Sequence, residues 1–440
     1  MGASLNDSLT LPCGAVLKNR IAKSAMTEGL ADPYNQATED HVRLYRKWSE
    51  GGCGLLLSGN IQIDRRSMER PGNIAVDNNG ALDMLARMTA AGTEAGNHFW
   101  AQISHGGRQS PASICPDPVA PSAVSLENFQ KDKFNPPREI TVDEIEDFIG
   151  RFAHVAGVCK DAGFTGVQLH SAHGYLLSSF LSPVTNQRTD EWGGSLENRT
   201  RFLRRALEAV RARVGPDFPI SVKINSADFQ KGGFDEGDSL QVLGWLGDWG
   251  VDLIEVSGGN YEEPAVLYGD TDPMGRPIRE STKKREAYFL EFAEKARAAT
   301  KAPLMVTGGF RSAAVMNEAL TSGDLDVVGI ARPLCTQPDA ANALLSGSAD
   351  RIDDHEKRLM PITAEDLGGP DVPEIAVREA NLFADLGWFC LQIIYLGQDK
   401  PLQPGLAPLQ ALQDYVAYET DKTVNWSGPA GNPTGSAAAE

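Results

Sequence analysis

The chain of 440 residues has little cysteine, a deficit of positive charge and no long apolar run. Its six cysteines are scattered with no Cys-x-x-Cys pair, which is typical of reduced thiols in a cytoplasmic protein. The 41 Lys and Arg against 59 Asp and Glu give a net charge of −18, which disfavours nucleic-acid and anionic-membrane partners. The sequence contains no apolar run of about 18 residues, so no transmembrane helix is predicted. The N-terminus also lacks a signal-peptide pattern, so we expect a cytoplasmic location.

An alternation of apolar strands and amphipathic helices is present instead. It predicts an α/β fold, a TIM (β/α)8 barrel rather than a doubly wound sheet, because no Gly-x-Gly-x-x-Gly follows a strand. The predicted strands are 20–26, 54–58, 98–103, 166–169, 219–224, 253–257, 303–307 and 327–330. The predicted helices are 38–50, 81–96, 238–250, 286–300, 312–322 and 340–345, with others beginning after a capping box at 141–144 and after Ser195.

The pattern divides the chain into three parts. Residues 1–345 form the barrel, and residues 346–424 form a C-terminal extension. The apolar stretch 385–396 predicts that the extension packs on the barrel or on a partner subunit, so we expect a homo-oligomer. Residues 425–440 are small and polar, and we predict that they are disordered.

The predicted fourth strand ends in a group of polar side chains, His170, His173 and Tyr175. Two imidazoles and a phenol within six residues suit a carbonyl oxygen that is polarised and a carbon that is protonated nearby. A structural turn and a zinc site are alternatives, since His-x-x-His is also a ligand spacing. Zinc is disfavoured because no third ligand is close in sequence. The long polar loop 188–199 that follows favours a functional site.

Other polar residues fall where barrel strands end, which is where TIM barrels place their chemistry. Each has an ordinary structural explanation by itself, but their joint placement indicates a site. The turns after strands seven and eight predict a phosphate site, with backbone N–H groups of Gly308, Gly309 and Ala331 and with Arg332 as the counter-charge. That implies a phosphorylated cofactor or substrate. The remaining amide, hydroxyl and ammonium groups suit the polar edge of a flat heterocycle.

A dense set of residues carries a family resemblance. They are His170-x-x-His173-Gly174-Tyr175-Leu176, Ser182-Pro183, Asn186-x-Arg188 and Gly193-Gly194-Ser195-x-Glu197-Asn198-Arg199. This combination closely resembles the Old Yellow Enzyme family of FMN-dependent NAD(P)H:flavin oxidoreductases, and residues 5–345 look like its barrel throughout.

The resemblance implies roles for individual residues. The flavin would lie beside the segment Ser24, Ala25, Met26 and Thr27, with Thr27 bonding its O4/N5 edge. Asn60 and Gln102 match positions that contact the ring, and Lys223 lies where the family has a cation near N1/O2. His170 and His173 match the pair that binds the substrate carbonyl, and Tyr175 matches the proton donor. No metal is implied.

Two departures stand out. One branch of the family has Cys at Thr27 and Tyr at Gly29, which leaves the redox tuning and the substrate contacts on that side open. Relatives with an iron–sulfur cluster carry a cysteine cluster after the barrel. Only Cys390 lies there, so we expect no such cluster.

The resemblance implies an ene-reductase that uses FMN with NADPH or NADH, and that reduces a small-molecule α,β-unsaturated carbonyl compound by a ping-pong scheme. Two alternatives remain. One is a flavin-free barrel lyase or isomerase that uses His170, His173 and Lys223. The other is an FMN-dependent dehydrogenase that oxidises an unknown metabolite.

Overall fold

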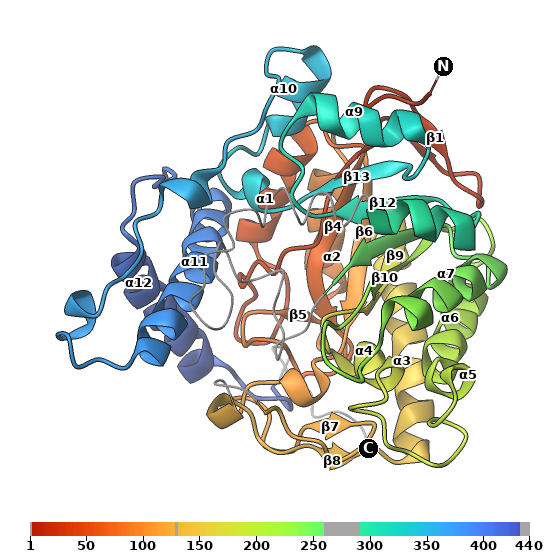
Figure 1. Cartoon of the computed structure of the whole chain (residues 1–440), viewed down its shortest axis with the longest axis horizontal. Helices are drawn as coiled ribbons and strands as arrows, with labels where there is room; N and C mark the ends of the chain where they lie inside the picture. The colour runs from red at the N-terminus through yellow and green to blue at the C-terminus, as the bar shows by residue number, and fades with distance from the viewer. Residues whose placement is uncertain (1, 128–130, 259–290, 432–440) are drawn as a thin grey trace.

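The computed structural model describes residues 2–127, 131–258 and 291–431. Within these residues, eight parallel strands close into a barrel, because β3 pairs with both β13 and β4 (Figure 1). The predicted TIM barrel is therefore confirmed. Its strands are β3 (Ile21–Lys23), β4 (Leu55–Gln62), β6 (His98–Ser104), β9 (Gly166–Ser171), β10 (Ile220–Asn225), β11 (Leu253–Ser257), β12 (Leu304–Thr307) and β13 (Val327–Ile330).

Helices surround the barrel and bury one face each. In α1 (Glu39–Glu50), Val42, Tyr45 and Trp48 are buried on the side that faces the barrel. The Thr141 capping box begins the longest helix of the barrel, α3, as predicted. The others are α2 (Leu82–Gly92), α3 (Val142–Asp161), α4 (Leu176–Leu181), α5 (Leu196–Arg199), α6 (Arg201–Val214), α7 (Glu236–Asp248), residues 291–299, α9 (Ala313–Ser322) and α10 (Ala340–Ser346). The first residues of the predicted helix 286–300 lie outside the described residues.

Short strands stand beside the barrel. An N-terminal hairpin consists of the antiparallel pair β1 (Leu9–Thr10) and β2 (Val16–Leu17). In the long excursion after β6, β7 (Val119–Ala120) pairs with β8 (Arg138–Glu139). In the loop after β4, β5 (Ile74–Ala75) pairs with the end of β4.

Two long helices form the C-terminal extension. Helix α11 (Glu374–Gly397) packs on α1 and on α12 (Pro408–Asn425), and both lie along one flank of the barrel (Figure 1). By length and composition α11 could cross a membrane, a possibility that the sequence analysis did not raise because charged residues interrupt its N-terminal half. Of its most apolar window, 67% is buried inside the protein, so packing accounts for its apolar character.

The prediction of a disordered tail over residues 425–440 is wrong for its first part. The indole Nε1 of Trp426 donates to Asn35 Oδ1 at 2.8 Å, and Ser427 N donates to the Pro33 carbonyl at 3.0 Å. Arg65 Nη1 also donates to the Gly431 carbonyl at 2.5 Å. These partners lie hundreds of positions away in sequence, so composition could not reveal them. Residues 432–440 lie outside the described residues.

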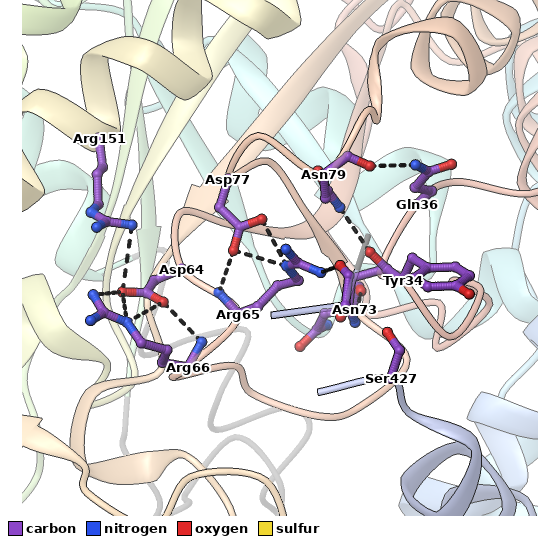
Figure 2. A network of polar contacts seen from close by, with 12 residues as sticks. Tyr34, Gln36, Asp64, Arg65, Arg66, Asn73, Asp77, Asn79, Arg151 and Ser427 are labelled. Atoms are coloured by element: carbon purple, nitrogen blue, oxygen red, sulfur yellow. Dashed lines mark hydrogen bonds and ion pairs between the residues drawn. The ribbon is translucent and has the colours of Figure 1, made fainter. Parts of the chain in front are cut away.

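A polar network holds the loop after β4 (Figure 2). Arg65 Nε donates to Asp77 Oδ1 at 2.7 Å, and Asp64 meets Arg66 at 2.6 Å and Arg151 of α3 at 3.7 Å. Three of these side chains, Asp64, Arg65 and Asp77, are largely withdrawn from water, so the loop is fixed. It carries two further residues, Glu69 and Arg70, to the mouth of the barrel.

Candidate active site

A cavity of about 1290 Å³ opens where the barrel strands end and reaches the two helices of the extension. This volume exceeds the roughly 300–1,000 Å³ of ordinary small-molecule sites. The structure brings nearly all the predicted site residues to its wall. They are Ala25, Met26, Thr27, Asn60, Gln102, His170, His173, Tyr175, Lys223, Gly308, Gly309, Ala331 and Arg332.

Ser24 is the exception among the predicted cofactor residues. Its side chain is fully buried, and its Oγ lies 2.6 Å from Thr307 Oγ1 on β12. It therefore supports the barrel interior below the cavity instead of lining the cavity.

The pairing register of three neighbouring strands places three charged or titratable side chains at the same height in the barrel. His170 on β9 is level with Lys223 on β10, which is level with Glu255 on β11. Lys223 Nζ lies 3.0 Å from Glu255 Oε1, and both side chains are buried. Glu255 also accepts a hydrogen bond from Thr307 Oγ1 at 2.7 Å. The lysine thus brings a compensated positive charge to the cavity wall.

Amides continue the polar layer across the barrel. Gln102 Nε2 donates to Gln168 Oε1 at 2.7 Å, and Gln168 Nε2 donates to Glu255 Oε2 at 2.9 Å. Register places Asn60 beside Gln102. Asn60 Nδ2 donates to Glu69 at 2.9 Å, while its buried Oδ1 has no protein partner among the described residues. A buried acceptor without a partner is costly, so this position calls for a ligand N–H.

The two histidines face each other at the cavity wall. Their ring centroids lie 5.0 Å apart. Nδ1 of His170 accepts the N–H of Ala172 at 3.3 Å, so the neutral ring carries its proton on Nε2 and is a donor there. His173 Nε2 lies 2.7 Å from Ser257 Oγ, at the end of β11.

Burial sets the charge state of the pair. It is the main cause that lowers the pKa of His173 to about 3, with the Lys223 ammonium acting in the same direction. Burial also holds the pKa of His170 well below its ordinary value, reinforced by His173 and Lys223. Both imidazoles are therefore neutral near pH 7, and a neutral imidazole offers one N–H donor.

A sharp turn returns Tyr175 to the histidines. His173 and Gly174 both adopt the left-handed region, with φ of 63° and 81°. The backbone N–H of His173 donates to Asn225 Oδ1 at 3.2 Å, which stabilises this conformation of a non-glycine residue. The Tyr175 ring then meets His170 edge-on, with centroids 4.8 Å apart. The two imidazoles and the phenol are thus brought together as the sequence predicted.

Thr27 is oriented by a relay that the sequence did not reveal. Asn73 Nδ2 donates to Thr27 Oγ1 at 3.0 Å, and Asn73 is within 3.2 Å of Glu69 Oε2. Because the threonine oxygen accepts from Asn73, its own O–H is left to donate. Since Thr27 lines the cavity, this donor is suited to a ligand acceptor.

The predicted phosphate site is only partly as expected. Gly308 and Gly309 have φ of 152° and 76°, a conformation in which an L side chain would be strained, so this turn requires glycine. Arg332, the predicted counter-charge, lies 3.7 Å from Asp385 and stacks on Phe389, both on α11. Arg332 therefore contacts the C-terminal extension as well as the cavity, and the sequence of the barrel does not predict the contact with the extension.

The sequence analysis missed Gln168, Ser257 and Glu255, although each lies on a barrel strand. A lone carboxylate in the apolar strand Leu253–Ser257 was the available signal for Glu255. Glu69 and Arg70 gave no signal, because they lie in a loop between predicted elements and Arg70 pairs with Glu419, 349 positions away.

These residues fit an FMN. The buried Oδ1 of Asn60 needs a donor, Thr27 offers a donor, and Lys223 offers a cation, which together match the polar edge of a flavin ring. The glycine turn at 308–309 exposes backbone toward the cavity, as a phosphate requires. The described residues contain no group of three or more His, Cys, Asp or Glu that could hold a metal ion.

Comparisons with known proteins agree with this site. The profile of the NADH:flavin oxidoreductase / NADH oxidase family matches residues 12–351. The NADH-dependent flavin oxidoreductase iliE of Hypocrea jecorina is 35% identical over 363 residues, which cover 76% of this chain and 88% of that protein. The iliE protein of Neonectria sp. is 35% identical over 353 residues, 75% of this chain, but this chain spans only 45% of its length.

A solved structure shows the same architecture. The Old Yellow Enzyme homologue of Zymomonas mobilis superposes with a TM-score of 0.68 at 25% identity, covering 83% of this chain and 98% of that one. The fold and the site define a TIM-barrel enzyme of the flavin oxidoreductase class. The chain belongs to the NADH:flavin oxidoreductase / NADH oxidase family, the Old Yellow Enzyme family.

Proposed function

We propose that this protein is an FMN-dependent NAD(P)H oxidoreductase that reduces the C=C bond of α,β-unsaturated carbonyl compounds. The observation that carries the proposal is the grouping of two neutral imidazoles and a phenol, His170, His173 and Tyr175, on the wall of a cavity that fits a flavin. The names of its NADH-dependent relatives support NADH as the reductant, with NADPH as the alternative.

The histidines would bind the substrate through its carbonyl oxygen. His170 donates from Nε2, and His173 supplies a second ring nitrogen from the same wall. Neutral donors draw electron density from the conjugated alkene without releasing a proton to it. Burial keeps both rings neutral, and the charge of Lys223 acts in the same direction because it opposes their protonation.

When bound, FMN would supply the hydride-transfer chemistry that side chains lack. Asn60, Thr27 and Lys223 would hold its polar edge. Tyr175 would hold the proton that the α-carbon receives, since its ring lies against His170, which fixes the carbonyl. The single cavity supports a ping-pong scheme in which both substrates use one site.

An anaerobic absorbance titration of the purified protein tests the proposal. NADPH or NADH should bleach a yellow protein, and a cyclic enone such as 2-cyclohexenone should restore the colour. A colourless protein that binds no added FMN would overturn the flavin assignment. A protein that bleaches but is not reoxidised by any enone would overturn the substrate class.

Tyr175→Phe separates the two half-reactions. It should slow reoxidation by 2-cyclohexenone by about 10²-fold, the typical contribution of a positioned acid, and leave bleaching by NADPH within twofold. Stopped-flow absorbance measures both rates. Equal loss in both half-reactions would show that Tyr175 positions the cofactor and is not the proton donor.

The assembly and the location remain proposals. The apolar residues Ile375 and Val424 are 48% and 76% exposed on the extension, which supports a homo-oligomer formed through α11 and α12. Light scattering of the purified protein would give the number of subunits. A cytoplasmic location, without nucleic-acid or membrane partners, also remains a proposal from the sequence.

A further inference from the structure

The C-terminal extension lies outside the part of the chain that the family profile matches. The match ends at residue 351, whereas α11 and α12 begin at Glu374 and Pro408. Yet both helices line the same cavity as His170 and Tyr175. One wall of the active site therefore comes from residues that are not part of the family's barrel.

The face that the extension turns toward the cavity is largely apolar. Its apolar members include Ala380, Phe383, Leu386 and Phe389 of α11 and Leu412 and Val416 of α12, and the charged residues Glu379, Asp385 and Glu419 stand among them. Phe383 lies three positions from both Ala380 and Leu386, so these three residues are neighbours on the surface of α11. Phe383 and Leu386 are only half-buried and both line the cavity, and Lys133 Nζ lies 3.5 Å from the centroid of the Phe383 ring.

This wall is fastened to the barrel. Tyr418 donates its hydroxyl to the Gly29 carbonyl at 2.8 Å, and Lys422 Nζ donates to the Ala31 carbonyl at 2.6 Å. From the other side, Arg43 of α1 donates to the Gly397 carbonyl at 2.8 Å. A wall anchored at several points is a fixed surface, and a fixed surface can select substrates by shape.

The barrel has made room for the extension at Gly29, where one family branch carries tyrosine. A Cβ there would lie 2.6 Å from Arg70 Nη2, at a φ of 70°. Arg70 is buried, forms an ion pair with Glu419 of α12 and lies over the ring of Tyr415, 5.3 Å from its centroid. Tyr415 lines the cavity, so α12 supplies the aromatic surface on this side.

We propose that α11 and α12 form the specificity wall of the active site, and that it selects an enone with an extended apolar body. The inference rests on the proposed function, because the carbonyl of the substrate would be held by His170 and His173. The apolar body would then lie against Phe383 and Leu386. A compact enone would leave this surface in contact with water.

A homologous series of enones tests the proposal on the full-length holoenzyme. From 3-penten-2-one to 3-undecen-2-one, kcat/KM should rise by up to about fourfold for each methylene that the wall buries. In the variant Phe383→Ala/Leu386→Ala, the ratio of kcat/KM for 3-undecen-2-one to that for 3-penten-2-one should fall at least tenfold. Gln413→Ala, an exposed site on α12 outside the cavity lining, should leave that ratio unchanged.

A second variant guards against loss of folding. Ala380→Trp adds bulk to the wall and should lower the same ratio without removing any packed side chain. If kcat/KM is independent of chain length in the wild type, or if neither variant changes the ratio, the proposal is overturned while the reductase function stands.

If the protein reduces no enone, the binding of phenols still tests the specificity wall separately from the proposed function. Calorimetry should then still show that 4-hexylphenol binds more tightly than 4-methylphenol, and that Phe383→Ala/Leu386→Ala removes most of the difference. That result would support the wall and overturn the proposed function. Equal affinity of the two phenols would overturn the wall.

Discussion

Lys223 determines the chemistry of the residues around it. Its ammonium compensates the buried carboxylate of Glu255, 3.0 Å away. The same charge opposes protonation of His170 and His173. Burial, as the main cause, and the charge of Lys223 thus act together to keep the two imidazoles neutral, and Lys223 also presents a cation to the cavity. A histidine pair without this neighbour would be more easily protonated, and its donors would be less well defined.

Replacing His170 or His173 by Ala should weaken the binding of 4-methylphenol by about tenfold, because each removes one hydrogen bond worth about 1–1.5 kcal/mol. The bound FMN should remain, since other residues face the flavin. Calorimetry and the visible spectrum measure the two quantities. His154→Ala, an exposed site on α3, is the control. Loss of FMN with unchanged phenol affinity would contradict these roles.

Glu255→Gln should lower the free energy of unfolding by about 3 kcal/mol, because it leaves the ammonium of Lys223 buried without its counter-charge. The matched control is Glu236→Gln, which breaks an ion pair of 2.9 Å with Lys295 at the surface. That solvent-exposed pair should contribute far less to stability. Urea unfolding followed by circular dichroism compares the two. Similar losses would show that Lys223 finds another partner.

The elements of the barrel were predictable because their signals are local. Short apolar runs bounded by turn residues marked all eight strands, and Thr141 with Glu144 marked the start of α3. Strand β4 was predicted to end at Ser58 but continues to Gln62, because Asn60 and Gln62 pair with β6 despite their polarity. A propensity argument could not anticipate this, since the pairing depends on a neighbouring strand.

Contacts between distant elements could not be predicted. Arg70 and Glu419 are in contact although 349 positions separate them in sequence. The sequence around either residue does not indicate its partner. The site residues were found where a strand end or a motif marked them. The cavity wall formed by α11 and α12 was not predicted. An apolar helix predicts that one of its faces is buried, but it does not indicate which part of the protein covers that face.

Thr141→Ala should lower the free energy of unfolding by about 1 kcal/mol, because it removes the N-cap of α3. Thr141 Oγ1 accepts from Glu144 N at 3.2 Å, and the Glu144 carboxylate accepts from Thr141 N at 2.9 Å. Val142→Ala changes an exposed residue, 41% accessible, next to it and serves as the control. Thermal unfolding of the wild type and the two variants measures whether Thr141→Ala destabilises the protein more than Val142→Ala does. An equal effect of both substitutions would rule out the capping contribution.

The whole molecule combines an acidic surface with histidines that are buried neutral. Burial lowers the pKa of His41 to about 3 and that of His105 to about 4. In each, Nδ1 accepts a backbone N–H, from Thr38 at 3.0 Å and from Gly107 at 3.1 Å. A proton on Nδ1 would remove that bond and leave a charge in the interior. Protonation is therefore coupled to unfolding.

The sign of this coupling predicts a loss of stability in mild acid. An unfolded histidine has a pKa of about 6.5, so below that pH the unfolded chain binds protons that the folded chain excludes. From pH 7.5 to pH 5.5, His41 and His105 should each lower the free energy of unfolding by about 1.4 kcal/mol. The loss continues toward the folded pKa values of about 3 and 4.

Urea unfolding at the two pH values measures the loss, and the variant His41→Gln isolates one contribution. Its absolute stability will change because a buried residue is replaced, but the difference between pH 7.5 and pH 5.5 should shrink by about 1.4 kcal/mol. His154→Gln, at the surface of α3, should leave the difference as it is in the wild type. If His41→Gln keeps the full pH dependence, then His41 is not held neutral by its buried contact with the start of α1.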